Sequence, residues 1–159
     1  MVGPNYLTSC CVRGLLTGRV RIADVPSPVL DAHALLVYFE REEGFETVKM
    51  RLAEALTRGD RLPMTVVNLG EVLYIVRREE GQDKAEEIER AVQMLPIEMV
   101  DVDMELTREA VRYKAAGGIS YADSYAAALA SLRGCPLLTG DPEFAAVAGQ
   151  VSIDWLQIL

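Results

Sequence analysis

From Pro28 onward the chain alternates short apolar runs with longer amphipathic segments, and this alternation limits the folds that it can adopt. Apolar side chains recur every three or four residues in the longer segments, which predicts helices. The expected helices cover residues 32–39, 45–58, 65–78, 82–94, 103–116, 120–132 and 142–147. The short runs at 29–30, 97–100 and 136–139 are candidate strands, and 151–153 is a further one. Because strands separated by helices form parallel sheets covered on both faces, we expect a helix-rich α/β fold with a small parallel sheet sandwiched between helices.

The length of 159 residues suits one domain with its own hydrophobic core. The first 23 residues stand apart, because they carry Arg13, Arg19 and Arg21 and no acidic residue. We expect residues 1–26 to be an N-terminal extension that is flexible or reflects a misassigned start. The alternative is a basic arm that contacts nucleic acid. Residues 27–159 are then the single folded domain.

The charge and cysteine content narrow the class of protein. A net charge of −8 and an isoelectric point of about 4.7 exclude an overall basic nucleic-acid-binding protein, although an acidic metal pocket in a nuclease is compatible with them. The three cysteines show no ligand spacing, and their odd number fits a reducing compartment. No apolar run approaches the roughly 20 residues of a membrane helix. We therefore expect a cytoplasmic protein that does not associate with membranes.

Three acidic residues lie at or just past the ends of candidate strands: Asp31, Asp101 and Asp141. Ligands of parallel sheets bind at the carboxyl ends of the strands, where the chain changes direction. Each of these residues has a simpler interpretation, because aspartate is also a preferred N-cap of the helix that follows. The spacing of Ser120 and Asp123 matches a capping box in the same way. Single positions therefore do not separate capping from a functional role.

Glu71 is the acidic residue that capping does not explain. It lies in the middle of an expected helix, in a predicted apolar stripe with Met64, Val67, Tyr74 and Ile75. A carboxylate in such a place is seldom buried unless it is paired or binds a metal ion. A buried ion pair with an arginine is therefore the alternative to a ligand role.

Asp123 has a comparable setting, because small alanine side chains follow it by one and two helical turns and allow a close approach of other elements. Two embedded acids facing strand-end acids would repel each other without a cation. Oxygen ligands favour Mg²⁺ or Mn²⁺ over zinc, and the single histidine, His33, excludes a histidine-rich site. We expect His33 itself to be a surface or packed helix residue rather than a substrate contact.

With these residues in place, the chain resembles a PIN-domain ribonuclease, and more narrowly the toxin component of VapBC toxin–antitoxin systems. The resemblance spans about residues 29–159 and rests on VLDAHALL with Asp31, TVVNLGEVLYIV with Glu71, ISYADSYAAALA with Asp123 and PLLTGDPEF with Asp141. It implies a PIN-like fold and a Mg²⁺- or Mn²⁺-dependent endoribonuclease that hydrolyses RNA phosphodiester bonds.

The resemblance also implies residue roles and partners. The four matching acids are expected to surround one or two metal ions and to form the catalytic centre. Thr139 and Ser120 match supporting hydroxyl positions, and Asn68 matches a polar position that accompanies the glutamate. The implied partners are an RNA substrate, a small cognate antitoxin protein and a second copy of the chain in a homodimer.

Other functions remain open at this point. A housekeeping PIN-domain nuclease for RNA processing is the main alternative, followed by a catalytically inactive PIN binding module. A phosphoacceptor signalling domain also gathers acids around Mg²⁺, but it needs a lysine at the end of a late strand, where this chain has Thr139-Gly140-Asp141. Expected contacts to the RNA backbone are Arg41, Arg77, Arg78, Lys114 and Arg133, most of which are equally well explained as solvated helix charges.

Overall fold

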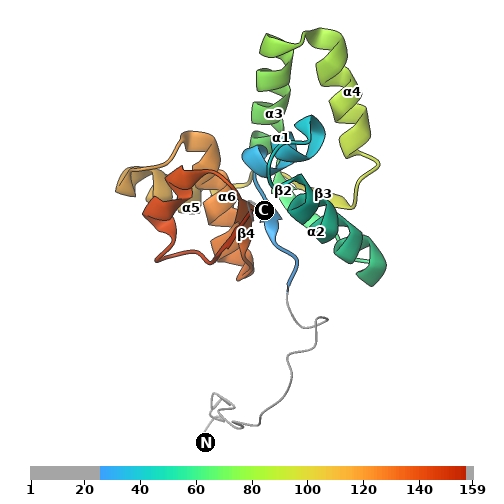
Figure 1. The fold of residues 1–159 in the computed structure, drawn as a ribbon. Helices are drawn as coiled ribbons and strands as arrows, with labels where there is room; N and C mark the ends of the chain where they lie inside the picture. Colours follow the sequence, from blue (N-terminus) through green and yellow to red (C-terminus); the bar gives the residue numbers. More distant parts are fainter. Residues whose placement is uncertain (1–25, 157–159) are drawn as a thin grey trace, which may run out of the picture.

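The computed structural model describes residues 26–156, so the expected extension at 1–26 lies almost entirely outside the described residues. The fold consists of short parallel strands with helices between them (Figure 1). The strands are β1 (Val29–Leu30), β2 (Leu62–Thr65), β3 (Ile97–Val100), β4 (Leu137–Thr139) and β5 (Ile153–Trp155). This arrangement confirms the predicted helix-rich α/β class.

The strands form two hydrogen-bonded ladders. In the first, β4 lies between β1 and β5, with Leu30 opposite Leu138 and Thr139 opposite Trp155. In the second, β2 pairs with β3 in parallel. Because β1 also packs beside β2, the strand order across the molecule is β3-β2-β1-β4-β5. The order reverses between β1 and β4, and such a reversal opens a crevice at the carboxyl ends of the two strands.

The helices begin where the sequence supplies caps. Their bounds are α1 (Ala32–Glu40), α2 (Phe45–Arg58), α3 (Val66–Glu79), α4 (Gln82–Val92), α5 (Met104–Ala116) and α6 (Tyr121–Arg133), followed by a 3₁₀ helix (Pro142–Val147). Asp31, Thr65, Asp103 and Ser120 each accept a hydrogen bond from a first-turn amide. In the described part of the chain, no helix is both long enough and apolar enough to cross a membrane.

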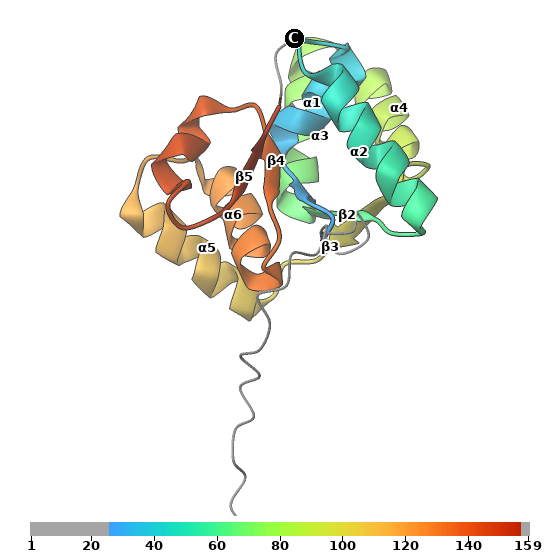
Figure 2. The same ribbon diagram turned by 60° about the horizontal axis from the view of Figure 1, so that its bottom comes forward.

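Two hydrophobic cores cover the two faces of the three-stranded sheet. Val29 and Leu137 point into the core formed with α5, α6 and the 3₁₀ helix, whereas Leu30 and Leu138 point into the core formed with α1 to α4. Figure 2 shows these two groups of helices on opposite sides of β1, β4 and β5. Because successive side chains of a strand point to opposite faces, two-residue segments of β1 and β4 contribute to both cores.

The structure departs from the sequence-based expectation at two strands and one helix. Strand β2 was not predicted, because it is short and contains Pro63, which has no backbone N–H for a ladder. Strand β5 lies about two residues later than the predicted segment 151–153. The last predicted helix is a 3₁₀ helix.

Leu138 provides a test of this arrangement, because it is fully buried on the central strand of the sheet. We expect Leu138→Ala to lower the free energy of unfolding by about 2–5 kcal/mol through lost burial and the cavity left behind. Leu56→Ala is the control, since Leu56 is 71% exposed on α2 and its truncation should change stability by less than about 0.5 kcal/mol. Urea denaturation of both variants measures the difference, and equal effects would contradict the described core.

Candidate active site

The ends of β1 and β4 are joined by a hydrogen-bond chain that runs through Thr139. Thr139 Oγ1 donates to Asp31 Oδ2 at 2.5 Å, and the backbone N–H of Asp141 donates to Thr139 Oγ1 at 2.9 Å. Asp31 follows β1 directly and Asp141 follows β4 after Gly140, as the sequence pattern predicted. Parallel pairing places these strand ends at one edge of the sheet, in the crevice between β1 and β4.

Asp31 is a buried carboxyl group, 1% exposed. Burial is the main cause that raises the pKa of Asp31 to about 7, and the like charges of Asp123 and Asp141 raise it further. Hydrogen bonds from Thr139 and from the Ala34 amide act in the opposite direction. The structure therefore holds an acid that a cation would stabilise in its charged form.

Asp123 enters the same electrostatic environment from the N-terminus of α6. Its backbone N–H donates to Ser120 Oγ, and its Oδ2 accepts from the Ser120 N–H, so the predicted capping box is present. The side chain is nevertheless buried, and its charge acts on both Asp31 and Glu71. Capping fixes the orientation of Asp123 without removing it from the acidic group.

Glu71 is held near Asp123 by a contact between α3 and α6. Asn68, one turn before Glu71, accepts a hydrogen bond from Thr65 Oγ1 at 2.5 Å, and its Nδ2 donates to the carbonyl of Ala122 at 3.1 Å. Burial raises the pKa of Glu71, and the charges of Asp123 and Asp141 raise it further. Asn68 therefore connects the helix that carries the glutamate to the residue that precedes Asp123.

The setting of Glu71 differs in part from the predicted apolar stripe. The side chain is half-buried rather than fully enclosed, because Tyr74 is exposed and Met64 belongs to β2. Within residues 26–156, Glu71 has no ion pair or hydrogen bond, so no arginine of that part of the chain neutralises it. The charge of Glu71 therefore remains available to a ligand.

The capping interpretation and a ligand role are compatible in this geometry. Each capping aspartate uses one carboxylate oxygen for a backbone amide: Oδ1 in Asp31 and Asp141, and Oδ2 in Asp123. Among the described residues, Asp141 Oδ2, Asp123 Oδ1 and both oxygens of Glu71 have no hydrogen-bond partner. The site therefore has unused carboxylate oxygens on three different segments.

These oxygens fit a hard divalent ion by their chemistry. Among the described residues, no group of three or more histidine, cysteine, aspartate or glutamate side chains is placed so that it could hold a metal ion by itself. Mg²⁺ does not require such a cage, because it usually keeps several waters and binds through one or two carboxylates. An acidic group with free carboxylate oxygens, in which the pKa values of Asp31 and Glu71 are raised, matches that mode of binding.

Other residues considered from the sequence lie apart from this group. Asp101 is exposed at the end of β3, an edge strand distant from the crevice in the strand order. Arg133 pairs with Glu98, Arg78 contacts Glu79, and Lys114 Nζ donates to the Ile119 carbonyl. These three cations already have protein partners, as expected for solvated helix charges.

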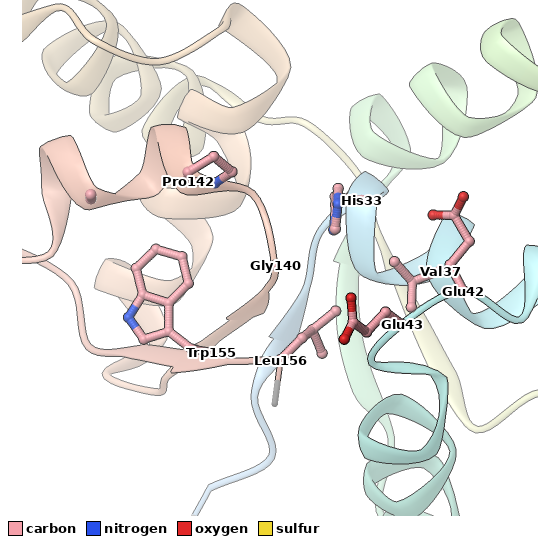
Figure 3. Close-up of a pocket in the computed structure, with 9 residues that line it drawn as sticks. His33, Val37, Glu42, Glu43, Gly140, Pro142, Trp155 and Leu156 are labelled. Atoms are coloured by element: carbon pink, nitrogen blue, oxygen red, sulfur yellow. The ribbon is translucent and has the colours of Figure 1, made fainter. Parts of the chain in front are cut away.

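A pocket of about 790 Å³ is lined by Gly140 and Pro142, the residues on either side of Asp141, and was not predicted from the sequence. His33 and Gly140, next to Asp31 and Asp141 in sequence, form one part of its wall, and Trp155 and Glu43 form others (Figure 3). Its residues come from separate segments, so no local motif marks it. The position of His33, two residues after Asp31, was the one indication in the sequence that it lies near the site. In the structure this histidine packs against Gly140.

The titration of Asp31 predicts how stability depends on pH without metal. The folded protein with a pKa of about 7 binds a proton that the unfolded chain, with a pKa near 3.8, has released. The contribution of Asp31 to the free energy of unfolding is therefore fully present below about pH 4 and is lost as the pH rises towards and through 7. Between pH 5 and 7 the loss is about 2 kcal/mol. In EDTA, Asp31→Asn should lack this part of the pH dependence, as measured by urea denaturation.

Asp103→Asn is the matched control, because Asp103 caps α5 through the same kind of bond but is exposed. It should keep the wild-type pH profile. Identical profiles for wild type and Asp31→Asn would show that Asp31 does not titrate as described.

The comparisons with known proteins agree with this geometry. The sequence model of the PIN domain matches residues 29–150. A member of the VapBC family of toxin–antitoxin systems, VapBC-5 from Mycobacterium tuberculosis, shares 25% identity with a TM-score of 0.54, over 84% of this chain and 100% of that one. The DNA-bound VapBC from Salmonella typhimurium shares 16% identity with a TM-score of 0.64, over 81% and 97%.

A third similar structure is VapC20 from Mycobacterium tuberculosis, described as a toxin that cleaves the sarcin-ricin loop. It shares 16% identity with a TM-score of 0.60, over 76% of this chain and 95% of that one. No curated protein matches the chain significantly. The family match covers β1 to β4 and all four acids, and the solved structures share the fold, so the chain belongs to the PIN-domain family.

Proposed function

We propose that this protein is a Mg²⁺- or Mn²⁺-dependent endoribonuclease and the toxin of a toxin–antitoxin pair. The observation that carries the proposal is that four acids from four segments lie close enough for their charges to act on one another near the carboxyl ends of β1 and β4. Asp31 and Asp141 follow adjacent strands, and the charges of Asp123 and Asp141 act on Asp31 and on Glu71. Membership of the PIN-domain family supports nuclease chemistry at this place.

Asp31, Glu71 and Asp123 would hold the metal, directly or through its bound waters, and Asp141 would be a further ligand or would position the attacking water. When bound, the metal supplies an activated water and neutralises charge that develops on the phosphodiester. The free carboxylate oxygens of Glu71, Asp123 and Asp141 can accept hydrogen bonds from that water and orient it. Among residues 26–156, no serine, threonine or cysteine forms a hydrogen bond with His33, the single histidine, which favours direct attack by water over a covalent intermediate.

Three polar residues would keep the acids in position. Thr139 Oγ1 holds the Oδ2 atom of Asp31 and leaves the other lone pairs of that carboxylate for a ligand. Ser120 fixes Asp123 through the capping box. Asn68 sets the distance between α3 and α6 and therefore between Glu71 and Asp123. We infer positioning roles for these residues.

The assignment as a toxin rests on the solved structures that share the fold. Several of them are VapBC toxin–antitoxin structures, and one is described as an RNA-cleaving toxin. A cognate antitoxin would cover the crevice, where its cationic side chains would meet the acids. A homodimer is part of the same proposal. A housekeeping RNA-processing nuclease would have the same crevice without a neutralising partner protein.

Glu71→Gln tests the ligand role, because Glu71 does not cap a helix and its substitution therefore removes no capping hydrogen bond. We expect cleavage of a defined RNA in Mn²⁺ to fall about 100-fold or more, and wild-type cleavage to stop in EDTA. In EDTA the variant should be as stable as wild type or slightly more stable, because repulsion from Asp123 and Asp141 is relieved. Thermal denaturation and mapped cleavage products measure both effects.

Glu79→Gln on the same helix is the control, since Glu79 is exposed and forms an ion pair with Arg78. It should keep full cleavage. If Glu71 were half of a buried ion pair, its substitution would instead lower stability by about 3–5 kcal/mol. Such a loss, or undiminished cleavage, refutes the ligand assignment.

The toxin assignment predicts a specific effect of co-expression. Expression of the protein should arrest growth, and co-expression of a small protein encoded beside it should restore growth by covering the acids. Asp141→Asn, which can still cap the 3₁₀ helix through its side-chain oxygen, should not arrest growth. Colony counts after induction provide the measurement. Growth arrest that no neighbouring gene product relieves would favour a housekeeping nuclease.

A further inference from the structure

The pocket beside the acids is built on the same segments that position the acids. Gly140 separates Thr139 from Asp141, and His33 lies two residues after Asp31. A Cβ atom at Gly140 would lie 2.8 Å from His33 Cε1 and 3.2 Å from Leu156 Cδ1. The absence of a side chain at Gly140 therefore lets His33 and Leu156 pack directly on the segment between Thr139 and Asp141.

The pocket walls suit a flat, uncharged ring. Pro142, Val37 and Leu156 contribute apolar surface, and the Trp155 side chain, 41% exposed, stands across from His33 (Figure 3). No lysine or arginine is among the described residues that line the pocket, so nothing there attracts a phosphate group. The volume of about 790 Å³ is in the range of sites for small molecules and exceeds what a single base needs.

Polar groups in the wall lack a protein partner among residues 26–156, and the exposed carboxylates of both Glu42 and Glu43 are among them. Within the described part of the chain, His33 Nδ1 is buried without a hydrogen bond, and the Glu43 carboxylate has neither a hydrogen bond nor an ion pair. Figure 3 shows the Glu43 carboxylate directed towards Leu156 and the space below His33, whereas the Glu42 carboxylate is turned away. Glu43 is thus the acceptor that a ligand in the pocket would meet.

We propose that this pocket binds the nucleobase next to the cleaved phosphodiester and that it selects guanine through Glu43. The inference rests on the proposed ribonuclease function and adds a substrate preference to it. Guanine presents two neighbouring donors, N1–H and the 2-amino group, which match the two oxygens of one carboxylate. Adenine, cytosine and uracil do not present two adjacent donors on this edge.

The position of the pocket connects the base to the reaction. A base stacked on Trp155 and contacting Glu43 would lie beside Gly140 and Pro142, which flank Asp141. Its sugar and phosphate would then extend towards the acids. Stacking on an aromatic side chain accepts any base, so Trp155 supplies affinity and Glu43 supplies the preference.

Trp155 is the only tryptophan of the chain, so its fluorescence reports on the pocket directly. We expect guanosine to quench this fluorescence saturably in EDTA. Inosine, which lacks only the 2-amino group, should bind about tenfold more weakly. Nucleosides without phosphate avoid repulsion by the acids, and EDTA separates binding from cleavage. Excitation at the red edge of the indole absorption avoids absorption by the nucleosides.

Glu43→Gln and Glu42→Gln form the matched pair of variants. Glu43→Gln should lose the tenfold difference between guanosine and inosine, and Glu42→Gln should keep it. For cleavage in Mn²⁺, two RNAs are compared that carry guanine or hypoxanthine at one position and are otherwise identical. The preference, kcat/KM for the guanine RNA divided by kcat/KM for the hypoxanthine RNA, should be lower for Glu43→Gln than for wild type, while the variant still cleaves both RNAs. A folded Glu43→Gln protein is verified by its unchanged thermal midpoint.

The outcomes separate the two proposals. Saturable guanosine binding with the expected variant pattern supports the base pocket even if no RNA is cleaved, whereas cleavage without base preference supports only the nuclease. Absence of quenching by guanosine, or equal effects of Glu42→Gln and Glu43→Gln, overturns the base pocket. Quenching by an arginine-containing peptide but not by guanosine also overturns it and assigns the pocket to a partner protein.

Discussion

The buried carboxyl group of Asp31 needs hydrogen-bond donors, and the surrounding structure is arranged so that it supplies them. An acid that is 1% exposed is tolerated because Thr139 Oγ1 and the Ala34 amide both donate to it, and because its pKa is raised to about 7. The bond from Thr139 requires β1 and β4 to be neighbours in register, with their carboxyl ends at the same edge. The arrangement of the sheet and the chemistry of the crevice therefore depend on the same contact.

The other acids add repulsion to this buried group rather than neutralising it. The pKa of Glu71 is raised by burial and by the charges of Asp123 and Asp141, and the contact from Asn68 to Ala122 keeps α3 and α6 together despite that repulsion. A structure that concentrates unpaired carboxylates has lower stability than one that pairs them, and such unfavourable groups are typical of functional sites. The proposed metal would relieve the repulsion at the place where it is strongest.

The sequence predicts the part of this design that depends on local patterns. Apolar runs followed by aspartate located β1 and β4 and their acids, and the serine–aspartate spacing located the start of α6. Strand β2 was not predicted, because it contains Pro63, a residue that is rare inside strands. The burial of Glu71 was overestimated, because Met64 belongs to that strand and not to the helix of Glu71. The pocket of Glu43 and Trp155 could not be predicted, because these residues are brought together only by the packing of β5 and the segment after α1.

The shared use of Asp31, Asp123 and Asp141 as helix caps affects how inactive forms of this protein should be made. Each of the three holds a backbone amide with one oxygen. Alanine at these positions would remove the charge and leave that amide without its partner, so a lost activity could reflect a loosened helix start. Asparagine retains a side-chain oxygen that can accept the same hydrogen bond. Glu71 does not cap its helix, whose N-cap is Thr65. Amide replacements, rather than truncations, therefore yield catalytically silent proteins that still present the native surface for structural work with RNA or a partner.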